Sequence, residues 1–497
     1  MVRRNFTLKI VKENKLIKKS LNILSKKLEK IDFILVTAST VICSLFSFAY
    51  SVYAKKYVLP LEYGIYTTCL LLQTYLNYAQ LGVMNSYNRD YPQFLGAEKS
   101  EEARKLKNTA FCFVILIYLI LMIIVDSAIL LLYSNALLEK HYFWGYLLCP
   151  ITVLLETIAS FCIYTERMEG RYNMTAAVSL IKTVAAIILG LFAIKKWFYY
   201  GLYIMPITGS LLSIAFYFKT SLKTIRFKID ITTLKYSIHT GLPLLINSLV
   251  WTIMSSVDKF IILFFMTTED LGVYSVPLMG FSTMVIVPQT ISQIFYYKIS
   301  RIYGETNSTH KLIDQCNQYT LLTSACTGIT AIVAYYLLPI LVDIFMPNYH
   351  AGIKPAQILI VGVAIYSATL LYSNIFSVLK LNLDLLVNTV VLCIFNIVTS
   401  TLFVMINGRQ VENVAVGTAM SYFLYSLLLL LRIHKRFNYN LRKLIMSGWF
   451  PVAVSIVPCL LFEKLFHSNY VAMIVSIFTA GIVYITVFIQ IWRKKNV

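Results

Sequence analysis

Charged side chains inside long apolar runs are the residues of this sequence that could do chemistry. Lys182 lies near the middle of "AAVSLIKTVAAIILG", where a positive charge costs a few kcal/mol to insert into a bilayer. Asp258 and Lys259 are neighbours in a second run, and Glu156 lies within a third, "ITVLLETIASF". Such charges commonly mark a substrate or ion pathway. Lys182 therefore predicts a positively charged binding site, although a paired structural lysine would give the same pattern.

Other charged residues add candidates to this site. Glu156 could carry a coupling proton, since a carboxylate in a low-dielectric setting can bind one; a hydrogen-bonded structural glutamate is the alternative. Asp258 could neutralise Lys182 from a facing helix, or belong to a structural ion pair near the outer interface. Arg89 and Lys298, at the inner ends of two runs, could grip a diphosphate or simply anchor the helices. The predicted cavity residues are Lys182, Lys259, Asp258, Arg89 and Lys298.

The composition places these charges in a membrane protein. Of the 497 residues, 58% are hydrophobic and 13% are charged, with a mean hydropathy of +0.71. Soluble domains carry roughly 25% charged residues. The net charge of +21 could suggest nucleic acid, but membrane proteins collect Lys and Arg in cytoplasmic loops. The nine scattered cysteines form no CxxC pair, and no nucleotide-binding or hydrolase motif is present, so we expect no metal, no cofactor and no enzyme.

The apolar runs predict an all-α polytopic membrane protein with about 14 transmembrane helices. About 34 of the 44 Lys and Arg fall on the inner side when the N-terminus is cytoplasmic, and about 8 on the outer side, which supports this register. Both termini are therefore expected in the cytoplasm, with residues 1–30 forming a basic amphipathic segment or a frayed tail. The predicted spans are 33–54, 63–87, 108–133, 142–164, 173–194, 200–218, 239–266, 272–297, 315–346, 355–379, 385–406, 414–432, 447–465 and 470–491.

A repeated motif divides the chain into two halves. "LPLEYGIYTTCLLL" at 59–72 and "TTEDLGVYSVPLMG" at 267–280 share an acid, a glycine and a tyrosine at the same spacing. Six predicted spans separate the copies, so both halves have the same orientation, as in a parallel repeat. We expect an N-lobe at 31–218, a cytoplasmic linker at 219–238, a C-lobe at 239–434 and two extra spans at 435–497. The motif residues are Glu62, Gly64, Tyr66, Asp270, Gly272 and Tyr274.

The segment 241–305 resembles a known transporter family. "GLPLLIN", "SSVDKFII" and "DLGVYSV" look like the seventh and eighth helices of the polysaccharide transporter family, and "LEYGIYTTCLLLQTYLNYAQLGVMNSYNRDYP" resembles its second helix. The resemblance implies flippases for undecaprenyl-diphosphate-linked oligosaccharides, such as O-antigen or capsule repeat units in lipopolysaccharide or exopolysaccharide synthesis. They belong to the superfamily that also holds multidrug exporters. The resemblance further implies two packed lobes, alternating access and a cationic cavity, in a protein of the bacterial inner membrane.

Competing functions remain open on the sequence alone. A lipid II flippase fits the same pattern, whereas a cation-coupled multidrug antiporter should have an acidic cavity, which Lys182 opposes. A membrane polysaccharide polymerase or glycosyltransferase should carry a large outer loop, and the predicted outer loops are short. The expected partners are the lipid-linked oligosaccharide, membrane lipids and the polymerase and glycosyltransferases of its pathway, with no nucleic acid. Without an ATP motif, an ion gradient or the membrane potential would drive transport.

Overall fold

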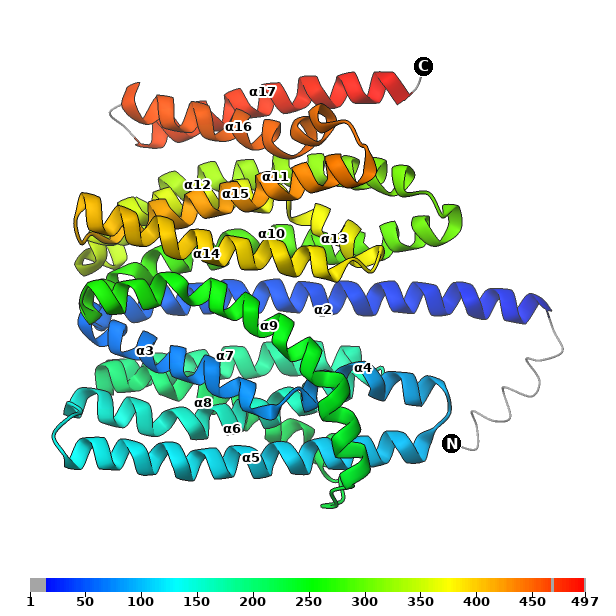
Figure 1. Cartoon of the computed structure of the whole chain (residues 1–497), viewed down its shortest axis with the longest axis vertical. Coiled ribbons are helices and arrows are strands. Elements are labelled where there is room, and N and C mark those ends of the chain that lie inside the picture. Colours follow the sequence, from blue (N-terminus) through cyan, green and yellow to red (C-terminus); the bar gives the residue numbers. More distant parts are fainter. Residues whose placement is uncertain (1–14, 466–468, 496–497) are drawn as a thin grey trace.

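The chain folds into a stack of long helices that run nearly parallel to one another. The computed structural model describes residues 15–465 and 469–495, and most side chains between 35 and 484. N-terminal helices form the lower part of Figure 1, C-terminal helices the upper part, and α17 the top edge. The first half contains α2 (Lys15–Tyr57), α3 (Pro60–Leu76), η1 (Asn77–Gln80), α4 (Val83–Gly96), α5 (Ser100–Ser134), α6 (Lys140–Met168), α7 (Tyr172–Trp197), η2 (Phe198–Tyr203), α8 (Ile204–Tyr217) and η3 (Phe218–Leu222).

The second half is also helical and ends in a further pair of helices. A final pair, α16 and α17, packs beside α11, on the side away from the N-terminal half. The second half contains α9 (Ile231–Phe265), α10 (Thr268–Thr306), α11 (Thr309–Phe345), η4 (Pro347–Gly352), α12 (Ile353–Ser367), α13 (Leu370–Val378), α14 (Asn382–Asn407), α15 (Val411–Phe437), α16 (Leu441–Leu465) and α17 (Asn469–Lys495).

The protein is an all-helical polytopic membrane protein. Ten stretches of the described chain are long and apolar enough to cross a bilayer. The stretch 172–222 holds two helices, α7 and α8, which pack against each other. The second predicted span is divided between α3 and α4, and the described apolar part of α17 is short. The count of fourteen spans thus stays a prediction, because some of its spans are broken or only partly described.

Residues 1–30, predicted as an amphipathic segment, lie largely outside the described side chains. The backbone from Lys15 is helical and continues into the first predicted span without interruption. Figure 1 shows this part of α2 extending beyond the other helices at one end of the stack. Residues 15–30 and the first predicted span are therefore one helix.

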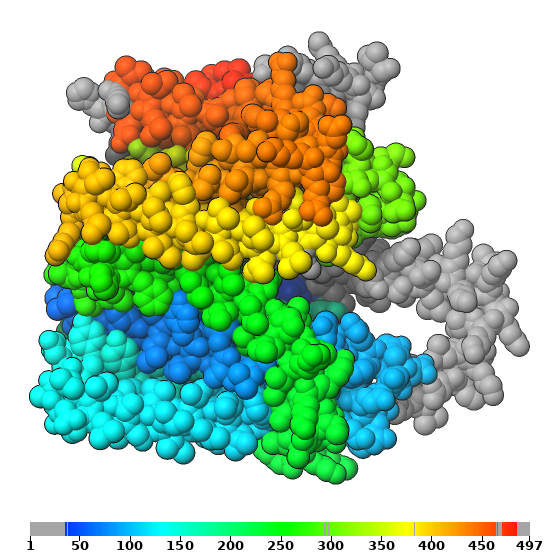
Figure 2. Space-filling view, viewed as in Figure 1, coloured from blue at the N-terminus to red at the C-terminus, as the bar shows by residue number. Residues whose placement is uncertain are grey.

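The helix α9 connects the two halves and touches both. Its N-terminal part packs against α4 and α5, and its remainder packs against α14. Figure 2 shows α9 crossing the face of the molecule between the yellow α14 and the cyan α5. Pro243 lies inside the helix, and a proline removes one helical hydrogen bond and bends the axis. We use N-lobe for residues 31–218 and C-lobe for 239–434.

The linker before α9 is hydrogen-bonded to the N-lobe. The Arg226 N–H donates to Asn108 Oδ1 over 3.1 Å, and the Asp230 N–H donates to Thr109 Oγ1 over 3.1 Å. Asp230 then caps α9 by accepting from the Thr233 N–H at 2.7 Å. Hydrogen bonds from the Thr232 hydroxyl and the Thr233 N–H to its carboxylate lower the pKa of Asp230 to about 2. The linker therefore belongs to the N-lobe, and the C-lobe begins within α9.

A charged cluster closes the predicted inner end of the N-lobe. The Lys107 ammonium lies 3.1 Å from Glu169 Oε1, and the Arg171 guanidinium contacts both Glu169 and the fully buried Glu166. Ser221 donates a hydrogen bond to Glu166. Because these residues belong to α5, α6, η3 and the start of α7, the cluster joins four segments of the lobe.

The repeated motif lies where the two halves meet. A Cβ added to Gly64 would lie 1.9 Å from the Thr268 carbonyl oxygen, and one added to Gly272 would lie 1.8 Å from the Pro60 carbonyl oxygen. The acids of the motif stabilise the first turns of α3 and α10. Glu62 accepts from the Leu59 N–H at 3.2 Å, and Asp270 accepts from the Thr267 N–H at 3.0 Å. Each copy thus caps a helix and then presents a glycine to the other copy.

The equivalent second helices of the two lobes differ in continuity. In the N-lobe, Leu81 has φ 53° and Gly82 has φ 82°, so the helix is interrupted between η1 and α4. The Gly82 carbonyl would lie 2.0 Å from a Cβ on Gly241, so α9 crosses the break at very close range. In the C-lobe, α10 continues from Thr268 to Thr306. The break is a feature of the N-lobe alone.

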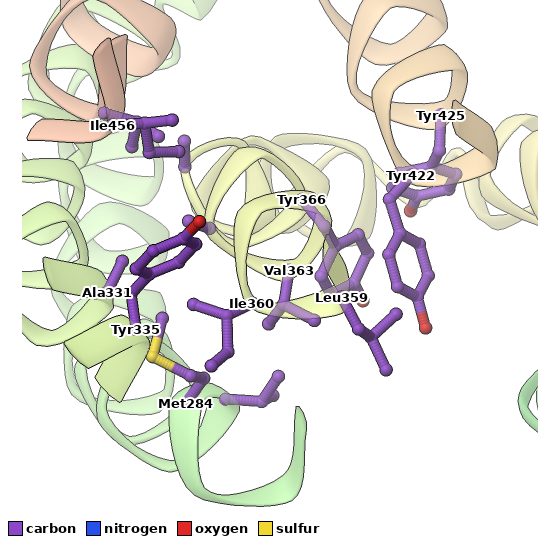
Figure 3. Close-up of a cluster of buried hydrophobic side chains, with 14 of the residues drawn as sticks. Met284, Ala331, Tyr335, Leu359, Ile360, Val363, Tyr366, Tyr422, Tyr425 and Ile456 are labelled. Atoms are coloured by element: carbon purple, nitrogen blue, oxygen red, sulfur yellow. The ribbon is translucent and has the colours of Figure 1, made fainter. Parts of the chain in front are cut away.

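The C-lobe has the larger apolar core. Side chains from α10, α11, α12, α15 and α16 converge in Figure 3, including Met284, Tyr335, Ile360 and Ile456. Only about 10 Å³ of space remains between α11, α12 and α16. Helix α16 is therefore packed tightly onto α11 and α12.

Candidate functional site

A cavity of about 680 Å³ lies between the two lobes. Helices α2, α3, α6 and α7 line it from the N-lobe, and α9 and α10 line it from the C-lobe. Among the described residues that line it, none is Asp or Glu. Its hydroxyl groups come from Thr40, Ser44, Ser47, Ser51, Thr67, Ser179, Thr183, Ser275, Ser282 and Thr283, and its cations from Lys55, Arg167, Lys182 and Lys259.

None of these four cations forms a salt bridge with another described residue. The Lys55 ammonium donates to Ser51 Oγ at 2.8 Å and lies 4.1 Å from the centre of the Tyr63 ring. Arg167 Nε and Ser275 Oγ are buried and have no hydrogen-bond partner within the described structure. Unpaired positive charges in a partly desolvated cavity attract anions, because the low dielectric strengthens the attraction. We call this space the cationic cavity.

An apolar groove of about 360 Å³ adjoins the cationic cavity. It lies between α2, α10 and α11 and is lined almost entirely by hydrocarbon, including Leu45, Val287 and Leu337. Four residues line both spaces: Phe48, Met279, Thr283 and Ile286. A ligand with a charged head and an apolar chain could therefore occupy the two spaces together.

A second interlobe cavity, of about 830 Å³, lies beside the broken helix of the N-lobe. Arg89 and Glu156 line it, but Arg89 is already bound to Asp90, with 2.6 Å between Arg89 Nε and Asp90 Oδ1. The other lining groups are mainly carboxamides, hydroxyls and tyrosine rings. These are Thr74, Asn77, Tyr78, Gln80, Asn85, Asn88, Thr157, Ser160, Tyr164 and Ser248. We call this space the carboxamide cavity.

A smaller cavity inside the N-lobe lies between these two. Its volume is about 290 Å³, and Glu156 and Lys182 both line it. Lys182 also lines the cationic cavity and Glu156 also lines the carboxamide cavity. Glu156 therefore influences Lys182 through space without a direct ion pair between them. A proton on Glu156 would change the electrostatic potential at Lys182, which is what a coupling role requires.

Asp258 lies outside the cationic cavity, within the C-lobe. Tyr274 donates to its carboxylate at 2.6 Å, Thr418 at 2.7 Å and Asn396 at 3.0 Å. The carboxylate is buried, and no cation forms a salt bridge with it among the described residues. The described residues contain no group of three His, Cys, Asp or Glu side chains that could hold a metal. Oxygen atoms of this kind can nevertheless accept a proton or a monovalent cation.

Of the remaining predicted residues, one lines the cationic cavity and the others do not. Lys259 points into the cationic cavity although its neighbour Asp258 does not. Lys298 lines none of the cavities described above; its ammonium lies 5.1 Å from the Phe295 ring centre, and the residue is exposed. Of the motif tyrosines, Tyr274 binds Asp258, whereas the Tyr66 ring packs edge-on against Tyr203 with 5.1 Å between ring centres.

Two cations of the cavity were not singled out by the sequence. Lys55 and Arg167 lie near the ends of predicted spans, where basic residues are common in any membrane protein. The only sequence signal for Lys55 is its place on the predicted outer side, where Lys and Arg are scarce. Nothing in the sequence distinguished Arg167 from the other inner basic residues.

A comparison with protein families identifies the family of this chain. A family model described as "Polysaccharide biosynthesis protein" matches residues 57–346, more than half of the chain. The chain belongs to the polysaccharide biosynthesis protein family. The match includes both motif copies and the whole lining of the carboxamide cavity, whereas the α2 residues that line the cationic cavity lie before it. No curated protein sequence matches this family member significantly.

Solved structures show what the fold of this family member resembles. The lipid II flippase MurJ, in an inward closed conformation, matches with a TM-score of 0.71 and 15% identity, covering 93% of this chain and all of MurJ. An inward-facing multidrug resistance MATE transporter of the MOP superfamily matches with a TM-score of 0.65 and 14% identity over 81% of this chain and 96% of its own. The Vibrio cholerae MATE transporter VcmN in its bent form scores 0.57, with 14% identity over 86% and 99%. At these identities the likeness concerns the fold.

Proposed function

We propose that the chain is a flippase that moves an undecaprenyl-diphosphate-linked oligosaccharide from the inner to the outer leaflet of a bacterial cytoplasmic membrane. The observation that carries this proposal is the cationic cavity with its unpaired Lys55, Arg167, Lys182 and Lys259. A diphosphate is the part of such a lipid that needs positive charge. Membership of a polysaccharide biosynthesis family supports a repeat unit of O-antigen, capsule or exopolysaccharide as the sugar.

The apolar groove supports a lipid rather than a soluble sugar phosphate. A polyprenyl chain in the groove between α2, α10 and α11 would place its diphosphate at Phe48 and Thr283, where the groove meets the cationic cavity. The chain then stays in hydrocarbon while the head passes through the protein. Moving the chain from the lipid tails into the groove costs little hydrophobic free energy, because both surroundings are apolar. We expect the pathway's glycosyltransferases and polymerase to act before and after this step.

Alternating access between the lobes would complete the transport cycle. The contact between Gly64 and Gly272 closes the predicted outer side, so the described conformation would receive its substrate from the cytoplasm. Energy would come from the ion gradient or from the membrane potential, which favours outward movement of an anionic head. Asp258 and Glu156 are the groups through which a proton or cation would act. Both termini would then be cytoplasmic.

A lipid II flippase is the second candidate, because the MurJ fold matches nearly the whole chain. Lipid II is also a polyprenyl diphosphate glycolipid, so the cationic cavity and apolar groove fit it equally well. The two candidates differ in the headgroup, which carries a peptide in lipid II. Complementation of a strain depleted of its lipid II flippase, compared with a strain lacking its polysaccharide flippase, separates them. We expect rescue of the polysaccharide strain only.

Reconstitution tests the flippase activity itself. The purified protein is placed in liposomes with a fluorescent undecaprenyl-diphosphate glycolipid, and a membrane-impermeant quencher reports the fraction that crosses. We expect transport by the wild type and a large loss in Lys259→Glu, which places a negative charge in the cavity. Lys228→Glu makes the same charge change on the exposed linker and should transport normally. Equal transport by Lys259→Glu and the wild type would reject the proposed role of the cavity.

A further inference from the structure

The carboxamide cavity has a chemistry that the diphosphate does not need. Asn77, Gln80, Asn85 and Asn88 all line it, within a stretch of chain that includes the helix break at Gly82. Each carboxamide offers an acceptor oxygen and two N–H donors. That combination matches the hydroxyl and acetamido groups of sugars, which both donate and accept hydrogen bonds. The cavity thus has the groups for a ligand that is rich in hydroxyls.

These carboxamides have free hydrogen-bonding capacity. Asn85 and Asn88 make no side-chain hydrogen bond to another described residue. Asn77 donates to the Gln73 carbonyl at 3.1 Å, which leaves its oxygen free, and Gln80 accepts from the Met84 N–H at 3.1 Å, which leaves its amide N–H groups free. A ligand could therefore bind without first breaking contacts of the fold.

The backbone beside these residues is irregular within a predicted membrane span. Leu81 and Gly82 adopt left-handed conformations, which end one helix and begin the next within the predicted membrane span. Such irregular backbone is tolerated at membrane depth only where it is buried in protein or lines an aqueous cavity. In transporters of repeated design, broken helices of this kind adjoin the substrate.

The sequence repeat shows that part of this chemistry is particular to the N-lobe. The motif spacing of 208 positions pairs Asn77 with Val285 and Gln80 with Pro288, whereas it pairs Asn85 with another carboxamide, Gln293. The C-lobe counterpart is also an unbroken helix. The helix break and the carboxamides of Asn77 and Gln80 are therefore not shared by the two copies.

We propose that the carboxamide cavity is a second subsite, which binds the neutral sugars of the lipid-linked oligosaccharide. This inference rests on the proposed flippase function. Helix α3 supplies Thr67 and Leu70 to the cationic cavity and Thr74 to the carboxamide cavity, and Asn77 continues the same face at the start of η1. Thr67 and Thr74 are seven residues apart, or roughly 10 Å along the helix. The headgroup extends along this face from its diphosphate to its distal sugars.

The charge of the carboxamide cavity favours uncharged sugars. Glu156 is its only acid among the described lining residues, and Asp90 already neutralises Arg89. An acidic sugar would meet Glu156 without an available cation, whereas a neutral sugar would bind through hydrogen bonds alone. Uronic acids are therefore poorer occupants than neutral hexoses or N-acetylated amino sugars.

Two lipids distinguish binding at the sugar subsite from binding at the rest of the site. Binding of undecaprenyl diphosphate, and of the same lipid carrying a neutral trisaccharide, is measured by fluorescence titration of the purified protein in detergent. The double variant Asn85→Leu with Asn88→Leu should bind the trisaccharide lipid roughly tenfold more weakly, since hydrogen bonds from two carboxamides are lost. Its affinity for undecaprenyl diphosphate should not change. Asn135→Leu, exposed in a predicted outer loop, is the matched control.

Each outcome of this experiment decides a separate question. An equal loss for both lipids, or no loss for either, would overturn the sugar subsite while leaving the flippase proposal intact. Failure of the wild type to bind either lipid would instead reject the flippase proposal. Thermal unfolding checks that the double variant is folded; Asn88→Leu alone, at an exposed position, gives a second reading with the same expected direction. A trisaccharide lipid that contains a uronic acid should bind more weakly than the neutral one.

Discussion

Gly64 and Gly272 pack backbone to backbone where the two lobes meet. A side chain on Gly64 would clash with the Thr268 carbonyl oxygen and the Gly272 amide nitrogen, which would lie 1.9 and 3.1 Å from its Cβ. Backbone atoms cannot rotate out of the way as a flexible side chain can. The repeated glycine is therefore needed for α3 and α10 to approach each other. We expect this contact to close the predicted outer side of the cationic cavity.

Gly64→Leu should hold the outer side open. Cys43 lines the cationic cavity, so a variant that keeps only this cysteine can report access to it. We expect a membrane-impermeant maleimide added from outside to label Cys43 several times faster in Gly64→Leu than in its parent. Gly96→Leu is the matched control, because a Cβ at Gly96 has nothing within 4 Å. Unchanged labelling in Gly64→Leu would mean that this contact is not the outer closure.

Lys182 should affect export according to its charge. Two unit charges about 4 Å apart attract by about 4 kcal/mol at an effective dielectric of 20, and desolvation cancels much of this. A net effect of about 1–2 kcal/mol, or roughly tenfold in binding, is expected. Lys182→Ala should reduce export, Lys182→Arg should retain part of it, and Lys182→Glu should be worse than alanine.

Surface polysaccharide in a flippase-deleted strain measures the Lys182 series, with membrane abundance checked by immunoblot. The exposed Lys228→Glu variant controls for the change of net charge. Full export by Lys182→Glu at normal abundance would show that this lysine does not contact the substrate.

Asp258→Asn should uncouple transport from the ion gradient. The amide has nearly the same shape: its oxygen can still accept from Thr418, and its NH2 group can donate to the hydroxyl oxygen of Tyr274, so the C-lobe should fold. It has no negative charge to hold a proton or cation. Imposed proton and sodium gradients across proteoliposomes should accelerate the wild type and not the variant. Asp343→Asn, at an exposed pair with His350, should respond like the wild type. An accelerated Asp258→Asn would exclude this carboxylate from coupling.

Lys107→Ala should destabilise the N-lobe. It removes the contact between the buried Lys107 ammonium and Glu169, and we expect a loss of about 1–3 kcal/mol because Glu169 is still partly exposed. Lys105→Ala breaks an exposed pair with Glu101 and should cost less than about 0.5 kcal/mol. Unfolding in denaturant compares the two variants. Similar losses would show that the inner charged cluster is not a stabilising unit.

The same cluster should give the protein a defined acid sensitivity. Burial alone would raise the pKa of Glu169, but Lys107, Tyr91 and Arg171 together hold this pKa below its usual value. The stabilisation is therefore present above the usual glutamate pKa of about 4.3 and is lost as the pH falls through the lower folded value. Thermal unfolding between pH 3 and 7 should show a smaller acid-induced loss in Glu169→Gln than in the wild type.

Topology can be tested by labelling single cysteines in intact cells. Positions in 134–141 and 407–413 should react with an impermeant reagent added outside, and positions in 435–446 should react only after the membrane is opened. Asn135 and Asn438 are suitable sites, because they follow α5 and α15. Outside labelling of 435–446 would contradict the cytoplasmic placement of both termini.

The sequence predicted which charged residues lie in mid-membrane, but it did not predict which way each side chain points. Lys182 and Lys259 stand out in apolar runs, and both line the cationic cavity. Asp258 was grouped with Lys259, but adjacent helical residues point about 100° apart, and only packing decides which one faces the cavity. Here Asn396 and Thr418, more than 130 positions away, hold Asp258 inside the C-lobe. Contacts over such separations cannot be read from local patterns.

The helix break in the N-lobe also could not be predicted from the sequence pattern. The run 63–87 has an apolar composition compatible with one helix, and Gly82 alone is weak evidence for an interruption. The close crossing of Gly82 and Gly241 makes the left-handed turn favourable, and that crossing depends on how α9 bends between the lobes. By contrast, the family and the all-helical class were predictable, because composition and the motifs around Gly64 and Gly272 are properties of the chain itself.

Tyr274 connects Asp258 to the helix that we expect to form the outer closure. Its hydroxyl binds Asp258, and it lies two residues after Gly272 on α10, about 3 Å along the helix axis. A proton or cation at Asp258 therefore alters a hydrogen bond of the helix that forms the closure. Linkage makes such an influence reciprocal. If occupancy of Asp258 favours the closed outer side by some factor, then opening that side must weaken the binding of a proton or cation to Asp258 by the same factor, so opening would favour its release.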